Sequence, residues 1–321
     1  MPQTTYFLML HARYHLLMSF RLTFRTTAML TMAPLLWAGN AIVGRLVHDL
    51  ISPFTLNFLR WSIAFIFLLP LAAQVLRKNS PMWLCWKQYA LLGILGIGSY
   101  NALLYLALKT SSPLNVTLVG SSMPIWMLLI GRIWFKTSIS RSQFLGAALS
   151  MLGVAVVLSR GDFQQLLMLK LVPGDWFILL ATVVWSLYSW LLAHNTHKAP
   201  EQACIRSNWA TFLMAQLIFG LGCSAVLAAG EAANHTLVLT PSWALVAAML
   251  FIAVGPAILA YRFWGEGVRN AGPATAGFFA NLIPLFTALL SIPILGQLPQ
   301  LYHALAFVLI VGGIIVSSRR S

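Results

Sequence analysis

The chain has very few charged side chains. Asp, Glu, Lys and Arg together make up 8% of its 321 residues, and only 6 residues are acidic, whereas a soluble domain carries about a quarter charged residues. Because so little charge cannot cover a protein of this length in water, the composition excludes a soluble globular domain. Hydrophobic residues account for 60% of the chain and the mean hydropathy is +0.83, which predicts an integral membrane protein.

Cysteine is also scarce, and motifs for nucleotides and metals are absent from the sequence. Cys85, Cys204 and Cys223 lie far apart without metal-ligand spacing and are expected to be free thiols. The chain has no phosphate-binding P-loop and no intramembrane cluster of His, Glu or Cys. We therefore expect no catalytic residues, no metal, no cofactor and no enzymatic activity.

Long apolar runs recur along the whole chain with short polar breaks between them. Each run has about the twenty residues that a helix needs to cross a bilayer. The predicted spans are Ala28–Val47, Pro53–Leu76, Tyr89–Leu108, Pro113–Phe135, Phe144–Ser159, Asp175–Ala193, Ala203–Ala228, Trp243–Gly265, Gly272–Leu295 and Tyr302–Ser317. The prediction is an all-α membrane protein of ten helices. The fifth span is the shortest, and without it the two termini would lie on opposite sides.

The net charge of +14 comes from basic residues that lie between the spans and form no clustered face. Nucleic-acid binding is therefore not expected. With the N-terminus inside the cell, the outer flanks hold only Arg45, Lys109, Arg160 and Lys170, and most other basic residues lie on the cytoplasmic side. This asymmetry fits the positive-inside rule. It predicts a multi-pass protein of the inner (plasma) membrane, surrounded by membrane lipid, with both termini cytoplasmic.

Residues 1–27 precede the first predicted span. They interleave Arg13, Arg21 and Arg25 with apolar residues, which suits a basic interfacial helix. A disordered segment, or a non-native start upstream of Met18 or Met29, remains the alternative. The predicted organisation is this extension (1–27), a first five-helix repeat (28–160) and a second one (173–318).

The two halves of the chain resemble each other. KTSSPLNVTLVGSSMPIWMLLI aligns without a gap on RNAGPATAGFFANLIPLFTALL, pairing Pro113 with Pro273 and Pro124 with Pro284 at an offset of 160 residues. The same offset relates GVAVV and GIIVS in the last spans of the halves. A unit with an odd number of crossings forces its second copy to enter the membrane upside down. The halves are therefore predicted to be inverted repeats, a design typical of secondary transporters that work by alternating access.

Pro124 and Pro284 lie near the middle of their spans. Each removes a backbone donor and can kink its helix, so we predict paired hinges. The alternative is that neighbouring helices satisfy the freed carbonyls and the prolines are merely tolerated.

Several phrases together resemble a known family. PLLWAGNAIVGR, NFLRWSIAF, YNALLYLALKTSSPLNVTLVGSSMPI, GAALSMLGVAVVLSRGD and GPATAGFFANLIPLFTALLSIPILGQ are similar to the paired EamA-like domains of the drug/metabolite transporter superfamily. The resemblance implies a ten-helix transporter with a central cavity between the repeats. Members export amino acids, including aromatic ones, other small metabolites or toxic compounds. One departure is Gln297 in Leu295-Gly296-Gln297, where the family usually has glutamate.

Polar and deep aromatic residues near mid-span are the candidates for lining that cavity, because polar groups in a bilayer core tend to face a wet interior. The candidates for substrate binding are Trp37, Asn40, Tyr100, Asn101, Ser121, Ser122, Trp185, Tyr188 and Asn281. Asn40 and Asn281 could instead hydrogen-bond only between helices. Trp37 and Trp185 could instead serve ordinary helix packing.

Arg60 is the one basic residue well inside a predicted span. It could act at the outer mouth as a structural or gating residue, pair with Asp49, bind a substrate carboxylate or snorkel outward. No carboxylate lies in the middle of a span, which favours facilitated diffusion over proton coupling.

The sequence as a whole predicts an exporter of small-molecule metabolites, amino acids first. The alternative within transport is efflux of amphipathic or cationic toxic compounds. A non-transporting scaffold or an intramembrane enzyme is the third reading. The sequence does not distinguish a monomer from a homodimer.

Overall fold

The computed structural model describes residues 22–111, 113–162, 164, 168, 172–194, 205–295 and 300–318. Within these ranges, ten helices are long and apolar enough to cross a membrane. The all-α fold with ten transmembrane helices is thereby confirmed. Most of the N-terminal extension, residues 1–21, lies outside the described part of the chain, as does Cys204.

The spans follow the chain in two sets of five. The first set is α2 (Phe24–Leu46), α3 (Pro53–Ala72) with η1 (Ala73–Leu76), η2 (Pro81–Cys85) with α4 (Trp86–Gly93), η3 (Ile94–Ser99) and α5 (Tyr100–Leu108), α6 (Pro113–Gly120) with α7 (Met123–Ile133), and α8 (Arg141–Leu158). The second set is α10 (Pro173–His194), α12 (Trp209–Ala233), α13 (Trp243–Ile252) with η4 (Ala253–Leu259) and α14 (Ala260–Ala271), α15 (Pro273–Ala280) with α16 (Leu282–Leu295), and α17 (Leu301–Ser318).

Local sequence explains where several helices begin. Proline opens α3, α6, α10 and α15, because the first turn of a helix has no use for the missing N–H. At α8, Ser140 and Gln143 form a reciprocal capping box. The seventh span begins at Trp209 rather than at the predicted Ala203, since the Asn208 side chain caps α12 by accepting hydrogen bonds from two backbone N–H groups of its first turn.

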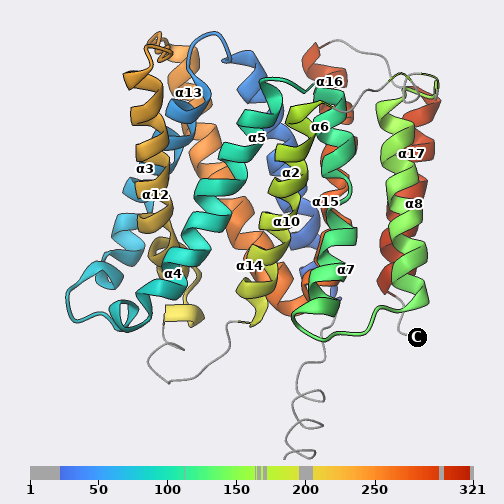
Figure 1. Cartoon of the computed structure of the whole chain (residues 1–321), viewed down its shortest axis with the longest axis horizontal. Helices are drawn as coiled ribbons and strands as arrows, with labels where there is room; N and C mark the ends of the chain where they lie inside the picture. The colour runs from blue at the N-terminus through green and yellow to red at the C-terminus, as the bar shows by residue number, and fades with distance from the viewer. Residues whose placement is uncertain are drawn as a thin grey trace, which may run out of the picture.

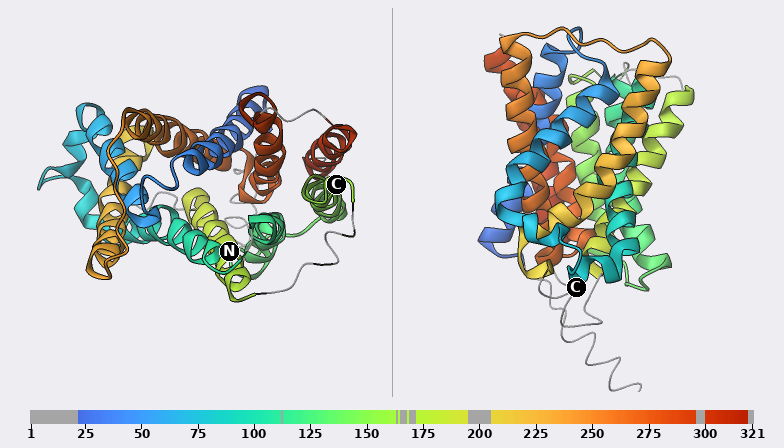
Figure 2. Two further views of the ribbon diagram at one scale, coloured as in Figure 1. Left: turned by 90° about the horizontal axis from the view of Figure 1, so that it is seen from above. Right: turned by 90° about the vertical axis from the view of Figure 1, so that its left-hand side faces the viewer.

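The packing of the helices follows the internal repeat. Equivalent helices of the two repeats pack on each other, α3 on α12 and α8 on α17, and these pairs form opposite ends of the bundle (Figures 1 and 2). Between them, α5 packs on α10 just as its equivalent α14 packs on α2. This reciprocal pattern is what an approximate two-fold axis in the membrane plane produces, so the repeats are inverted as predicted.

The third and fourth spans of each repeat are irregular at matching places. The third spans contain π-helical turns, η3 and η4, and an offset of 160 residues carries 94–99 onto 254–259 within η4. The fourth spans are interrupted by a turn at Ser121 and Ser122 and by one at Asn281, which the same offset relates to Ser121. Both interruptions come just before the paired prolines Pro124 and Pro284. The two repeats therefore share their irregular helical turns as well as their regular helices.

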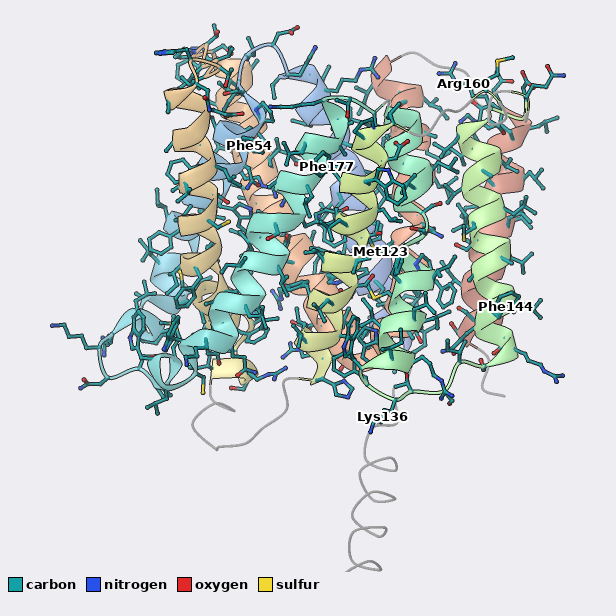
Figure 3. The ribbon with its side chains drawn as sticks, viewed as in Figure 1. Phe54, Met123, Lys136, Phe144, Arg160 and Phe177 are labelled. Carbon is teal, nitrogen blue, oxygen red and sulfur yellow. The ribbon has the colours of Figure 1, made fainter. Side chains whose placement is uncertain are left out.

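Because the chain crosses the bundle an even number of times, the first and last described residues, 22 and 318, lie on the same face. Lys136 and Arg160, labelled in Figure 3, lie at opposite faces. We call the face near Lys136 the lower face and the face near Arg160 the upper face. Phe54, at the start of α3, is also at the upper face (Figure 3).

The α8–α17 pair is held in close contact by small residues. A side chain at Gly313 would place its Cβ 2.7 Å from the backbone oxygen of Gly146 and 2.9 Å from the nitrogen of Ser150. The neighbouring Gly312 has nothing within 4 Å of the corresponding position. Close backbone approach through small residues is the usual way helices associate in lipid.

We therefore expect Gly313→Ala to lower the melting temperature in detergent, because the added methyl meets backbone that cannot yield. The cost should be about 1–3 kcal/mol. The matched control is Gly312→Ala, which should leave the melting temperature unchanged or raise it, since alanine favours a helix over glycine by about 1 kcal/mol. Equal melting temperatures for the two variants would contradict this packing.

Candidate functional site

Aromatic rings from both repeats meet in the interior of the bundle. We call this group the ring cluster: Trp37, Trp61, Tyr100, Trp185, Tyr188, Tyr261 and Trp264. Its members come from α2, α3 and α5 of the first repeat and from α10 and α14 of the second. The predicted residues Trp37, Tyr100, Trp185 and Tyr188 are thus brought together in one place.

Trp185 lies at the centre of the cluster and is only 3% exposed. Its ring centroid is 5.0 Å from that of Tyr100, 5.1 Å from Tyr188 and 5.3 Å from Trp37. The rings of Tyr261 and Trp264 follow at 5.6 and 5.8 Å. These separations and the tilted or edge-on orientations are those that attract aromatic pairs, so the cluster joins the two repeats directly.

Two hydrogen bonds tie the cluster to the π turns. The Tyr261 hydroxyl donates to the Gly96 backbone oxygen in η3 at 2.5 Å, and Trp37 Nε1 donates to the Pro256 oxygen in η4 at 3.2 Å. Gly96 and Pro256 are equivalent under the 160-residue offset. A π turn departs from the regular hydrogen-bond ladder of the helix, and lipid offers no water to replace a lost backbone partner. Each repeat therefore supplies a side-chain donor to a backbone oxygen in the π turn of the other repeat.

Gly96 also makes room for the cluster. A Cβ at this position would lie 2.6 Å from the ring of Tyr188, so a larger residue would push the tyrosine out of place. The Tyr188 hydroxyl in turn donates to Gln216 Oε1 on α12 at 3.2 Å, and Trp264 Nε1 donates to Ser189 Oγ at 3.1 Å.

The three candidate asparagines have different surroundings. Asn281 Nδ2 donates to Ser150 Oγ on α8 at 2.8 Å, which is the interhelical bond considered as its alternative role. Asn101 Nδ2 donates to the Ile97 oxygen of its own span at 3.4 Å. Asn40 is half-buried, and its Oδ1 is buried without a hydrogen-bond partner among the described residues. None of the three joins the ring cluster, and their roles in substrate binding stay predictions.

The serines and prolines mark the interruptions in the fourth spans. Ser121 Oγ and Ser122 Oγ each donate to a backbone oxygen three residues earlier, at 2.6 Å. Pro124 then lies in the first turn of α7, and Pro284 lies in α16 close after the turn at Asn281. The breaks therefore exist at symmetric positions, and a hinge motion at them remains a prediction.

Arg60 is buried within α3 and only 4% exposed. Its guanidinium lies 5.2 Å from the centroid of the adjacent Trp61 ring. Asp49, considered as an ion-pair partner, is instead 86% exposed and lies 3.3 Å from His48. A role of Arg60 as a gate or at the outer mouth stays a prediction.

A small cavity opens below the ring cluster toward the lower face. Its volume is about 20 Å³, and its wall includes Tyr188, Tyr261, Arg262, Glu266 and Arg269. A space of this size holds about one water molecule. Arg262 and Glu266 in this wall form an ion pair, with Arg262 Nε 3.3 Å from Glu266 Oε1.

Basic groups near the lower face are partly buried. Arg206, which precedes α12, donates to the Leu192 oxygen at 2.8 Å, and its own backbone oxygen accepts from Arg269 at 3.0 Å. Burial, with a smaller contribution from the Arg269 charge, lowers the pKa of Arg206 to about 10. The guanidinium therefore remains charged at neutral pH and keeps the lower end of the bundle positive.

Two buried carboxylates connect the repeats near the upper face. Glu231, at the end of α12, accepts from the backbone N–H groups of Phe54 and Thr55 at 3.0 and 2.7 Å, at the N-terminus of α3. Asp175, at the start of α10, accepts a hydrogen bond from Ser111 beyond α5. A carboxylate at a helix N-terminus is favoured by the orphan N–H groups and the helix dipole.

Three members of the cluster were not among the residues predicted from the sequence: Trp61, Tyr261 and Trp264. Tyr261 could have been found, because the 160-residue offset pairs it with the candidate Asn101. The same offset pairs Trp264 with Leu104 and Trp61 with Leu221, which are apolar and were not candidates, so neither tryptophan gave such a signal.

Ten membrane-spanning helices in inverted repeats, joined at the bundle interior by side chains from both halves, are an arrangement typical of secondary membrane transporters. The EamA-like transporter family model matches residues 26–159 and again 172–319. The chain belongs to this family.

Known proteins similar to this chain include an uncharacterized transporter, YyaM, of Bacillus subtilis, which is 25% identical over 76% of this chain and 74% of its own length. The aromatic amino acid exporter YddG of Ancylobacter novellus is 24% identical over 76% of this chain and 78% of its own. A probable terminal-alkyne amino-acid exporter of Streptantibioticus cattleyicolor is 22% identical over 79% of this chain and 80% of its own.

A solved crystal structure has the same fold. It superposes with a TM-score of 0.71 at 21% identity, covering 91% of this chain and 94% of the other. The arrangement of the helices is thus one already seen in a crystal.

Removing the hydroxyl of Tyr261 tests the hydrogen bond between the repeats. Tyr261→Phe keeps the ring but leaves the Gly96 oxygen without this donor, and should cost about 1–2 kcal/mol, measured as a lower melting temperature in detergent. Tyr100→Phe is the control, because no hydrogen bond of the Tyr100 hydroxyl is present in the described part of the chain. A control variant as destabilised as Tyr261→Phe would show that the bond contributes nothing specific.

Proposed function

We propose that this transporter exports small metabolites, amino acids first and aromatic ones among them, by alternating access between its inverted repeats. The observation that carries the proposal is the ring cluster. It offers flat apolar faces contributed by both repeats, so a substrate ring entering between the repeats would replace ring contacts that already exist. The names of two relatives as amino-acid exporters support the same choice of substrate.

The proposed motion separates the repeats at the ring cluster. The π turns and the interrupted fourth spans are the places where the helices depart from regular geometry, and such places absorb conformational change most readily. Because the irregularities occur in symmetric pairs, exchanging the conformations of the two repeats would turn an opening at one face into an opening at the other.

We propose that the protein lies in the plasma membrane. Its lower face then faces the cytoplasm. Arg206, Arg262 and Arg269 are all at this face, in line with the excess of basic residues on the cytoplasmic side. Both termini would then be cytoplasmic.

The proposed energetics is facilitated diffusion. The buried carboxylates Glu231 and Asp175 lie near the ends of their spans, and both are occupied in hydrogen bonds. Glu266, in the cavity wall toward the lower face, is paired with Arg262. These carboxylates are therefore poorly placed to carry protons past a substrate at mid-membrane. Efflux of amino acids from proteoliposomes should proceed without a pH gradient.

The transport test compares two tryptophans of one helix. Trp185→Ala removes the centre of the ring cluster and should reduce the flux of labelled phenylalanine from proteoliposomes by about tenfold or more, as expected for losing a buried aromatic contact of about 1.5 kcal/mol. Trp176→Ala, also on α10 but 66% exposed, should leave the flux unchanged. An unaltered flux in Trp185→Ala, with the protein folded, would sink the proposed site.

A further inference from the structure

One face of α3 carries three buried polar atoms that have no hydrogen-bond partner in the described part of the chain. They are Asn57 Oδ1, Arg60 Nε and Trp61 Nε1, in side chains that are 2%, 4% and 0% exposed. The spacing i, i+3, i+4 places these side chains within about one quarter to one third of the helix circumference. A buried polar group without a partner costs free energy, so three on a single helical face require an explanation.

Of the three buried groups, the guanidinium of Arg60 costs the most free energy to bury, because it alone carries a charge. The structure contains no ion pair of Arg60 among its described residues, and the contact with the Trp61 ring at 5.2 Å is its nearest compensation. Removing a charged group from water without a counter-ion costs several kcal/mol. A buried arginine without an ion-pair partner is suited to pair with an anionic group that binds and is then released.

The position of the face fits a substrate site. Asn57 Nδ2 donates to Ser224 Oγ on α12 at 2.9 Å, so the face lies where the two repeats meet. The Trp61 ring lies 4.9 Å from that of Tyr261 in the ring cluster. A motion that parts the repeats would therefore expose the polar face and the rings together.

We propose that Asn57, Arg60 and Trp61 form the subsite for the head group of an α-amino acid. Arg60 and Trp61 supply two donors for a carboxylate, and Asn57 Oδ1 supplies an acceptor for the ammonium group. The substrate side chain then extends onto the ring cluster. This inference rests on the proposed function and adds to it the chemical groups that distinguish an amino acid from a cationic amphiphile.

The experiment uses the purified full chain in proteoliposomes and measures efflux of labelled phenylalanine. Unlabelled phenylpropionate, which lacks the ammonium group, and phenethylamine, which lacks the carboxylate, serve as competitors. The wild type should be inhibited more strongly by phenylpropionate. Trp61→Phe keeps an aromatic ring but removes the indole N–H together with its five-membered ring, and Arg60→Gln removes the charge. Each should reduce the phenylalanine flux by about tenfold. Arg60→Gln should also abolish the difference between the competitors, whereas Trp61→Phe, which keeps the Arg60 charge, should only narrow it.

Two further variants keep the test decisive. Arg45→Gln alters an exposed arginine at the end of α2 and should behave as the wild type. Arg60→Lys keeps the charge without the guanidinium and should show an intermediate flux, which covers the case in which Arg60→Gln does not fold.

The outcomes separate this inference from the proposed function. Phenylalanine flux that persists in Trp61→Phe and in both Arg60 variants, with the competitor preference intact, would overturn the subsite and leave amino-acid export standing. A wild type that moves no phenylalanine or other amino acid would overturn the proposed function and the subsite with it.

Discussion

A backbone inside lipid must find all its hydrogen-bond partners within the protein, and this requirement governs how the two repeats are joined. The third span of each repeat widens into a π turn, and in each turn an equivalent backbone oxygen accepts a bond from an aromatic side chain of the other repeat. Neither repeat can therefore move away from the other without giving up a partner for its own backbone. The same residues that satisfy the backbone also build the ring cluster.

The symmetry between the repeats is close in backbone and loose in side chains. The π turns, the helix breaks and the packing pairs all recur. The residues at equivalent positions differ, as Gly96 differs from Pro256 and Asn101 from Tyr261. A symmetric frame gives two related conformations, whereas unlike side chains allow a single site between the repeats to recognise an asymmetric small molecule.

Much of the fold could be predicted from sequence, because bilayer thickness sets the length of each apolar run and the odd number of spans per repeat sets the inversion. The paired prolines also pointed to the interrupted fourth spans. Helix ends were less accurate, as at α12, where the cap formed by Asn208 outweighs the apolar residues before it.

The candidate site was predictable only in part. Depth along a span could be estimated from sequence, and it brought out Trp37, Tyr100, Trp185 and Tyr188 of the ring cluster. The direction of a side chain around its helix could not, because the spans are apolar on nearly every side. Asn281 therefore proved to bond Ser150 instead of joining the rings, and the polar face of α3 was represented by Arg60 alone.

Hydrogen–deuterium exchange of the protein in lipid nanodiscs, with and without phenylalanine, tests most directly whether the repeats part at the ring cluster. Backbone amides in η3 (Ile94–Ser99) and η4 (Ala253–Leu259) should change their exchange rates together when the amino acid is added, because each turn depends on a donor from the opposite repeat. The tightly packed α8–α17 pair should not change. Transport of phenylalanine with an exchange response in only one π turn, or in neither, would contradict a motion centred on the ring cluster.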